Sequence, residues 1–134
     1  MTTSAMPTSQ AFLEFWRERH LCIVTTLRPD GTPHVVPMGV VLDPERGSAW
    51  AITSGTSRKA GNIRSAGDGG ALFAACQVDG RRWATIEGRA WIRDDEESVT
   101  EAVRRYAERY RVPRENPGRV ALHVEVTRVL GNVA

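Results

Sequence analysis

The stretch 51–64, AITSGTSRKAGNIR, combines residue types that bind anions. A predicted strand ends at Thr53, a small polar loop follows, and Ser57 stands where a helix begins. The first turn of a helix presents free backbone N–H groups and the positive end of its dipole. Arg58 and Lys59 add cations there, which the dipole disfavours unless something negative is bound. The pattern predicts a phosphate site, and a capped surface helix with solvated basic residues is the alternative.

A second chemically informative stretch is 76–91, CQVDGRRWATIEGRAW. Its DG pair predicts a tight hairpin turn, and Trp83 follows that turn next to Arg81 and Arg82. An aromatic ring beside cations can stack on a planar ligand or lie in a subunit interface. A half-buried strand tryptophan is the alternative. Gly88, inside the returning strand, indicates a bulge or the close approach of another backbone.

Metal ligands and catalytic motifs are absent from the sequence. The three histidines and two cysteines are scattered, without a CxxC pair or the spacing of a zinc site, so no metal site is predicted. There is no GxSxG elbow and no HExxH helix. We therefore predict no catalytic residue; if the protein is an enzyme, a cofactor brings the reactivity and the chain holds it in place.

The elements needed to position these residues follow from the periodicity. Alternating and β-branched patterns predict strands at 21–27, 33–42, 48–53, 71–78, 83–93 and 119–130. Helices are predicted from the Ser9 cap to about His20, after Ser57, and from Asp94–Asp95 to about Arg111, with Glu101–Arg105 and Arg104–Glu108 paired on a solvated face. This order predicts a mainly β fold, a six-stranded antiparallel barrel with flanking helices.

Length and composition bound the class of protein. The chain has 134 residues, which predicts a disordered tail at 1–8 and one domain at 9–134. A net charge of +2 does not favour nucleic acid as a partner, and no apolar run reaches the ~18 residues of a membrane span. The first ten residues do not form a secretory signal, so a cytoplasmic location is expected.

These residues resemble a known family. TSGTSRKAxN (53–62), placed after a strand, is similar to the phosphate-binding segment of the pyridoxamine-phosphate-oxidase-like flavin and deazaflavin split barrels. Further stretches resemble the subgroup that binds the deazaflavin coenzyme F420; they are FxxERHLxxxTTLRxDGxPHVVPxG, QVDGRRW, IEGRA, RYxxRYRxPRxNPxRV and EVxRVLG. Together they span residues 12–131, so the resemblance implies an FMN-binding type of split β-barrel.

The resemblance also implies a homodimer with two cofactor sites at the subunit interface. The residues expected to hold the phosphate and part of the tail are Thr53, Ser54, Ser57, Arg58, Lys59 and Asn62. Those expected to line the ring are His34, Val36, Pro37, Met38 and Gly39. Those expected to reach in from the partner subunit are Gln77, Val78 and Trp83. Arg81 and Arg82 are expected to bind substrate propionates.

The activity implied is hydride transfer from reduced F420 to a planar acceptor, with biliverdin, reduced to bilirubin, as the expected substrate. Arg58 departs from the nearest deazaflavin pattern, which has glutamine at this position, and matches the FMN enzymes. An FMN-dependent, pyridoxamine-phosphate-oxidase-like oxidoreductase therefore stays open. A non-catalytic protein that binds F420, FMN or a tetrapyrrole is the third possibility.

Overall fold

The structure is a computed structural model that describes residues 2–3 and 6–134. Its strands are β1 (Thr2–Thr3), β2 (Cys22–Leu27), β3 (Pro33–Met38), β4 (Val41–Asp43), β5 (Ser48–Ser54), β6 (Ala71–Asp79), β7 (Arg82–Arg93) and β8 (Arg119–Asn132). Its helices are α1 (Gln10–Arg17), α2 (Arg58–Ser65) and α3 (Glu96–Arg109). None of these helices is long and apolar enough to cross a membrane.

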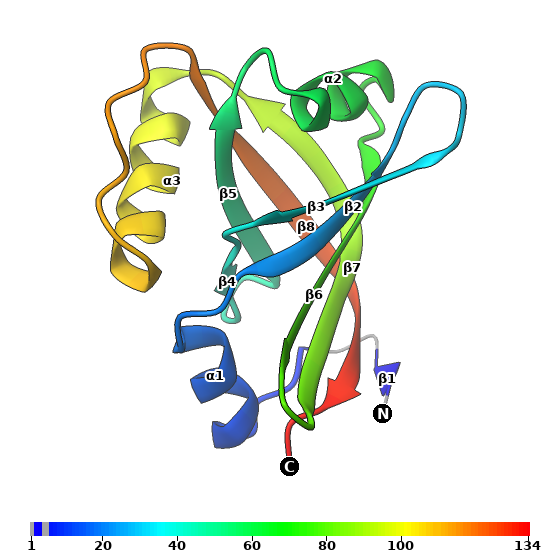
Figure 1. Ribbon diagram of the computed structural model, residues 1–134, viewed down its shortest axis with the longest axis vertical. Coiled ribbons are helices and arrows are strands. Elements are labelled where there is room, and N and C mark those ends of the chain that lie inside the picture. Colours follow the sequence, from blue (N-terminus) through cyan, green and yellow to red (C-terminus); the bar gives the residue numbers. More distant parts are fainter. Residues whose placement is uncertain (1, 4–5) are drawn as a thin grey trace.

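The strands form one antiparallel sheet that curves into a barrel open along one side (Figure 1). The strand order is β3-β2-β6-β7-β8-β5-β4, and β1 adds to β8. The short strand β4 pairs only with the first half of β5, from Ser48 to Trp50. The second half of β5 pairs with β8 alone, and β3 pairs with β2 alone. The free edge of β5 leads directly into the start of α2.

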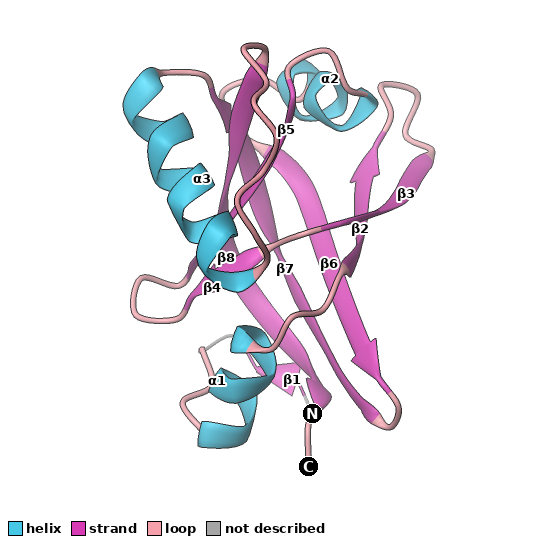
Figure 2. Ribbon diagram, turned by 60° about the vertical axis from the view of Figure 1, so that its left-hand side comes forward, coloured by secondary structure: helices cyan, strands magenta, loops and turns pink. Residues whose placement is uncertain are grey.

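The three helices close the barrel from different sides (Figures 1 and 2). α1 lies at one end and buries Phe12, Phe15 and Trp16, while α2 lies at the other end and buries Ile63. α3 packs along β4, β5 and β8. Apolar residues from every side meet inside the barrel, among them Val24, Ile86 and Leu122, none more than 1% exposed. This core fixes the positions of the barrel edges.

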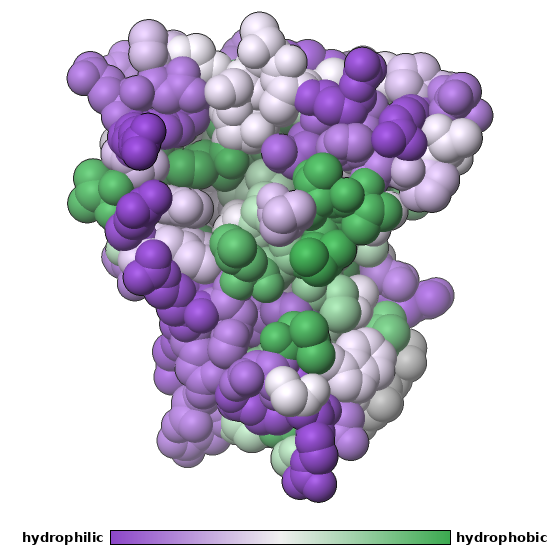
Figure 3. Space-filling model, in the orientation of Figure 1, coloured by the Kyte–Doolittle hydropathy of each residue, from purple (hydrophilic) through white to green (hydrophobic). Residues whose placement is uncertain are grey.

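One surface of the sheet is apolar and exposed; we call it the outer face. Cross-strand neighbours point to the same side of a sheet, so the register places Ile23, Pro37 and Cys76 on this face, with Val78 beside Trp83. Figure 3 shows hydrophobic residues gathered across the middle of one side of the molecule. The exposed apolar side chains of β2, β3, β6 and the residue before β2 are Leu21, Ile23, Leu27, Val35, Leu72 and Val78, which are 39% to 62% exposed.

The predicted fold class is confirmed, with corrections to its strands. The segment 33–42 is not one strand: it breaks at Gly39 and Val40, where the chain leaves β2 and turns to β5, so the sheet has more than the six predicted strands. At Gly88 both predicted features are confirmed: the register with β8 shifts between Glu87 and Gly88, and a Cβ at Gly88 would lie 1.8 Å from the Glu125 carbonyl oxygen. The tail at 1–8 stays a prediction: residues 1 and 4–5 lie outside the described residues, and β1 pairs with β8.

Candidate functional site

The first turn of α2 is built as the sequence predicts an anion site would be. Ser57 is the N-cap, and its hydroxyl accepts a hydrogen bond from the Ala60 amide at 3.2 Å. The Thr53 hydroxyl, at the end of β5, donates to the Ser57 hydroxyl at 3.0 Å. The two hydroxyls therefore lie side by side at the positive end of the helix dipole.

Two further properties leave this turn open to an anion. The amides of Arg58 and Lys59 have no hydrogen-bond acceptor among the described residues, as expected for the first N–H groups of a helix. The side chains of Arg58 and Lys59 likewise have no carboxylate within ion-pair distance in the described part of the chain. The first turn contains no acidic residue. Its donors and its charge thus remain uncompensated.

The loops beside this turn hold it in place. Asn116 donates from its amide to the Ser54 hydroxyl at 2.9 Å, and the Gly55 amide donates to the Gly118 carbonyl at 2.8 Å. Arg64, in the last turn of α2, donates back to the Gly55 carbonyl at 2.6 Å. The loop between β5 and α2 is therefore fixed from both sides, which pre-organises the anion site.

His34 brings the edge strand β3 to the same site. Its pKa is lowered from 6.5, first by desolvation and then by the positive charges of Arg28, Lys59 and Arg58. These cations therefore act on one imidazole, which lies on the inner side of β3 opposite Thr26. The structure thus places one predicted residue of β3, His34, within electrostatic range of the cations at the start of α2.

The other residues predicted on β3 face different ways. Val36 lies opposite the buried Val24, on the same side as His34, while Pro37 lies opposite Ile23 on the outer face. Met38 is buried in the core at 7% exposure. Only His34 and Val36 combine partial exposure with the inner side of the strand.

Asn62 is placed near His34 through a shared neighbour. It is 2% exposed, and its amide nitrogen donates to the Thr26 hydroxyl at 3.0 Å. Its amide oxygen has no partner among the described residues, so this buried acceptor can still take a hydrogen bond. Asn62 thus links α2 to β2 at Thr26, the residue whose cross-strand neighbour on β3 is His34.

Gln77, Val78 and Trp83 are not brought to this site within one chain. They lie at the β6–β7 hairpin, at the opposite end of the barrel from α2 (Figure 1). Val78 is 62% exposed on the outer face, with Trp83 directly across from it. Gln77 is fully buried: its amide nitrogen donates to the Phe15 carbonyl at 2.9 Å, and its oxygen accepts from Arg109 at 2.7 Å.

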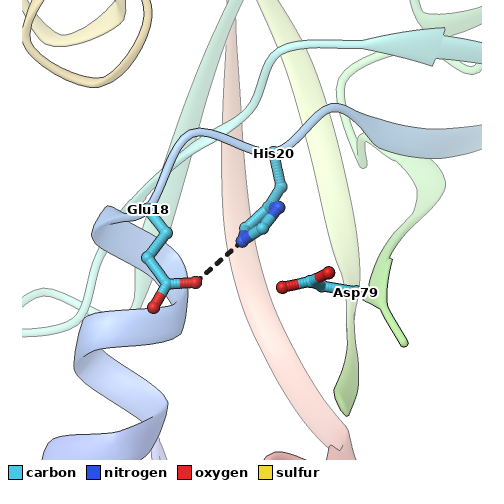
Figure 4. Close-up of side chains that lie close together, drawn as sticks. All are labelled: Glu18, His20 and Asp79. Atoms are coloured by element: carbon cyan, nitrogen blue, oxygen red, sulfur yellow. Dashed lines mark hydrogen bonds and ion pairs between the residues drawn. The ribbon is translucent and has the colours of Figure 1, made fainter. Parts of the chain in front are cut away.

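The two arginines predicted to bind substrate differ in their surroundings. Arg81 is exposed, whereas Arg82 donates to Glu18 at 3.0 Å and to Asp79. Arg82 and His20 hold the pKa of Glu18 down at about 2. Glu18, His20 and Asp79 lie close together (Figure 4), a grouping that could hold a metal ion. Since the Arg82 guanidinium already bridges both carboxylates, the geometry is that of an ion-pair cluster.

Several residues with structural importance for the site were missed from the sequence. Arg28 and Asn116 stand in turns, and the signal for them is a polar residue beside a proline-containing loop. Arg109 and Tyr110 carry no such signal, because Val40, the backbone they hold, lies about seventy residues away in the sequence.

The donor set fits a phosphorylated ring cofactor. Free amides, two hydroxyls and two unpaired cations suit a phosphate group. The half-buried inner side of β3 next to them offers apolar surface for a ring. No carboxylate in the described residues pairs with these cations, so none competes with a bound phosphate for them. A barrel open at one side with an anion site at its edge defines a cofactor-binding split barrel.

The chain belongs to the pyridoxamine 5'-phosphate oxidase family, which it matches over residues 8–132. It is 46% identical over 132 residues to an F420H(2)-dependent biliverdin reductase of Mycobacterium tuberculosis, covering 98% of this chain and 93% of that protein. The fold resembles the conserved hypothetical protein Rv2991 of Mycobacterium tuberculosis, with a TM-score of 0.74, 23% identity and coverage of 96% and 87%. It also resembles an F420 reductase, with a TM-score of 0.72, 20% identity and coverage of 92% and 98%.

Proposed function

We propose that this protein is an F420-dependent oxidoreductase that reduces a planar acceptor, with biliverdin as the substrate and bilirubin as the product. The observation that carries the proposal is the uncompensated anion site at Ser57, Arg58 and Lys59, in a chain 46% identical to a reductase of this kind. Reduced F420, when bound, supplies the hydride.

The chain's own contribution is binding and orientation. The free amides of Arg58 and Lys59, together with the hydroxyls of Thr53 and Ser57, hold the phosphate. The inner side of β3, with His34 and Val36, faces the ring and excludes water from it. Arg81, exposed and without an ion-pair partner in the described residues, pairs with a propionate of the acceptor. The proton comes from solvent or from a water held by an arginine.

We infer that the active form is a homodimer assembled through the outer face. Six large apolar side chains there are 39% to 62% exposed, which is typical of a protein interface. Val78 and Trp83 lie on the same face, so a second copy can bring them to the site of its partner. Two free cysteines, Cys22 and Cys76, fit the reducing cytoplasm as the location.

The test is a pair of titrations followed by turnover. F420 and FMN are titrated separately into the purified protein, with binding measured by fluorescence. We expect binding of F420 and oxidation of reduced F420 that depends on added biliverdin. Binding of F420 without turnover of biliverdin or any other planar acceptor would identify a carrier rather than a reductase.

Arg58 favours FMN as the second candidate cofactor, because it matches the residue of the FMN enzymes at this position. The variant Arg58→Gln restores the residue of the deazaflavin pattern. If the protein uses F420, this variant keeps F420 binding. If FMN is the cofactor, the wild type binds FMN more tightly than F420, and Arg58→Gln weakens FMN binding.

A further inference from the structure

The link between β3 and β4 has no strand partner of its own. At Val40 its backbone groups are instead satisfied by the C-terminal end of α3 and the residue after it. The Val40 amide donates to the Tyr110 hydroxyl at 3.1 Å, and that hydroxyl donates to the His20 carbonyl at 2.6 Å. Val40 is fully buried, so its amide has no access to water in place of Tyr110.

Arg109 reinforces the same link. Its guanidinium donates to the carbonyls of Val40 and Glu18 and to the side chain of Gln77. It is 7% exposed and has no carboxylate partner among the described residues, so its charge is satisfied by neutral oxygens. A buried cation held in this way ties three separate segments to one rigid planar group.

Gly39 completes the contact. A Cβ at this position would lie 2.8 Å from a ring carbon of Tyr106 and 2.9 Å from one of Tyr110. The two rings lie 5.0 Å apart, centroid to centroid, so the backbone of Gly39 lies directly against a packed aromatic pair. The rings of Tyr106 and Tyr110 therefore set the distance between α3 and the end of β3, and there is no room for a side chain at Gly39.

We propose that Tyr110, with Arg109, is a positioning residue that sets where the ring-facing side of β3 lies relative to the anion site. The inference rests on the proposed function. β3 is an edge strand, held by β2 on one side only, and it ends at Met38. β2 sets the register of His34 and Val36, and the anchors just beyond Met38 fix the end of this strand, so they contribute to the placement of both residues, while the phosphate is held separately by α2.

The test is Tyr110→Phe, which keeps the ring against Gly39 and removes the hydroxyl. We expect kcat for oxidation of reduced F420 to fall by about tenfold, since small misplacements of reacting groups are costly. The dissociation constant of F420 is expected to change by less than about threefold, because the charge-assisted contacts to the phosphate are untouched. Amide hydrogen exchange at Val40 is expected to accelerate.

The matched control is Ile86→Val, which removes one methyl group from the core and leaves the hydrogen-bonding groups of this link unchanged. It is expected to lower the melting temperature comparably and to leave kcat within about twofold. Equal kcat losses in both variants, or an unchanged kcat in Tyr110→Phe, overturns the positioning role alone. If Tyr110→Phe does not fold, Tyr106→Leu removes the other ring edge and is expected to give the same kcat-selective loss. An unaltered protein that fails to oxidise reduced F420 overturns the proposed function, and this inference with it.

Discussion

Arg58 and Lys59 differ in their surroundings from the paired arginines of α3. Arg104 donates to Glu101 and Glu108 at 2.7 and 2.6 Å, and Arg105 lies 3.2 Å from Asp43. Such pairs neutralise these cations within the chain, and two of the pairs, Arg104–Glu108 at 2.6 Å and Arg105–Glu101 at 3.4 Å, are those predicted from the i, i+4 spacing. At the start of α2 the cations remain unpaired beside a helix dipole of the same sign. Unpaired cations together with free amides at a helix start support the proposed anion site over a capped surface helix.

Lys59, the only lysine, is expected to contribute directly to cofactor binding. Lys59→Ala is predicted to weaken F420 binding by ~1.5–3 kcal/mol, the range for a lost charge-assisted hydrogen bond. Fluorescence titration measures the dissociation constant. Arg17→Ala, an exposed cation at the end of α1, is the control and is expected to leave binding unchanged. An unchanged dissociation constant in Lys59→Ala would remove Lys59 from the site.

The pKa of His34 reports the same positive charges. Since Lys59 helps to lower it below 6.5, Lys59→Ala is expected to raise it, and so is bound F420 through its phosphate. Because the folded pKa lies below the unfolded value, the folded state binds fewer protons, and stability is lost as the pH falls below 6.5 and through the lower folded pKa. NMR titration of the imidazole tests this; a pKa that does not move in Lys59→Ala contradicts the geometry.

At the scale of the elements, α2 and α3 have equivalent caps and different surroundings. Ser57 caps α2, and Asp95 caps α3 by accepting from the Ser98 amide at 3.0 Å. Replacing either cap residue by alanine is predicted to lower the free energy of unfolding by about 1 kcal/mol. Only Ser57→Ala is expected also to weaken F420 binding, by about 1.5 kcal/mol. Chemical denaturation and fluorescence titration separate the two effects, and equal F420 affinity in both variants would contradict a role for Ser57.

Local patterns predict the elements well, and the contacts between them poorly. The caps at Ser9, Ser57 and Asp95 and the DG turn depend on residues close in sequence, and each was predicted. The break of the strand 33–42 depends on Tyr106 and Tyr110, about seventy residues away, so its own alternation did not show it. Gln77 was expected at a cofactor from the family resemblance, and nothing near it in sequence indicates that Arg109 holds it in the core.

Two surfaces of the whole molecule differ in their chemistry: a sheet edge with unpaired cations, and the apolar outer face. The edge, where β3 and the end of β5 meet α2, holds the uncompensated cations and half-buried apolar positions. The outer face holds no comparable charge at its centre: Ile23 there has Pro37 and Cys76 as its cross-strand neighbours. A surface of this kind is stable in water when a second protein covers it. A second copy is the partner that would also supply Val78 and Trp83.

A charge in the centre of the outer face is therefore expected to dissociate the dimer. Ile23→Arg places a guanidinium where the interface requires apolar contact, and an unpaired buried charge is costly. We predict a monomer by sedimentation, with F420 binding weakened at least tenfold (about 1.4 kcal/mol), because the site loses its partner's residues. Val112→Arg is the control: Val112 is 79% exposed, follows α3 and lies outside this face, so the variant should stay dimeric. If Ile23→Arg sediments as wild type and binds F420 equally well, the outer face is not the interface. If it is monomeric yet binds F420 normally, each chain holds a complete site, and the partner contributes nothing to it.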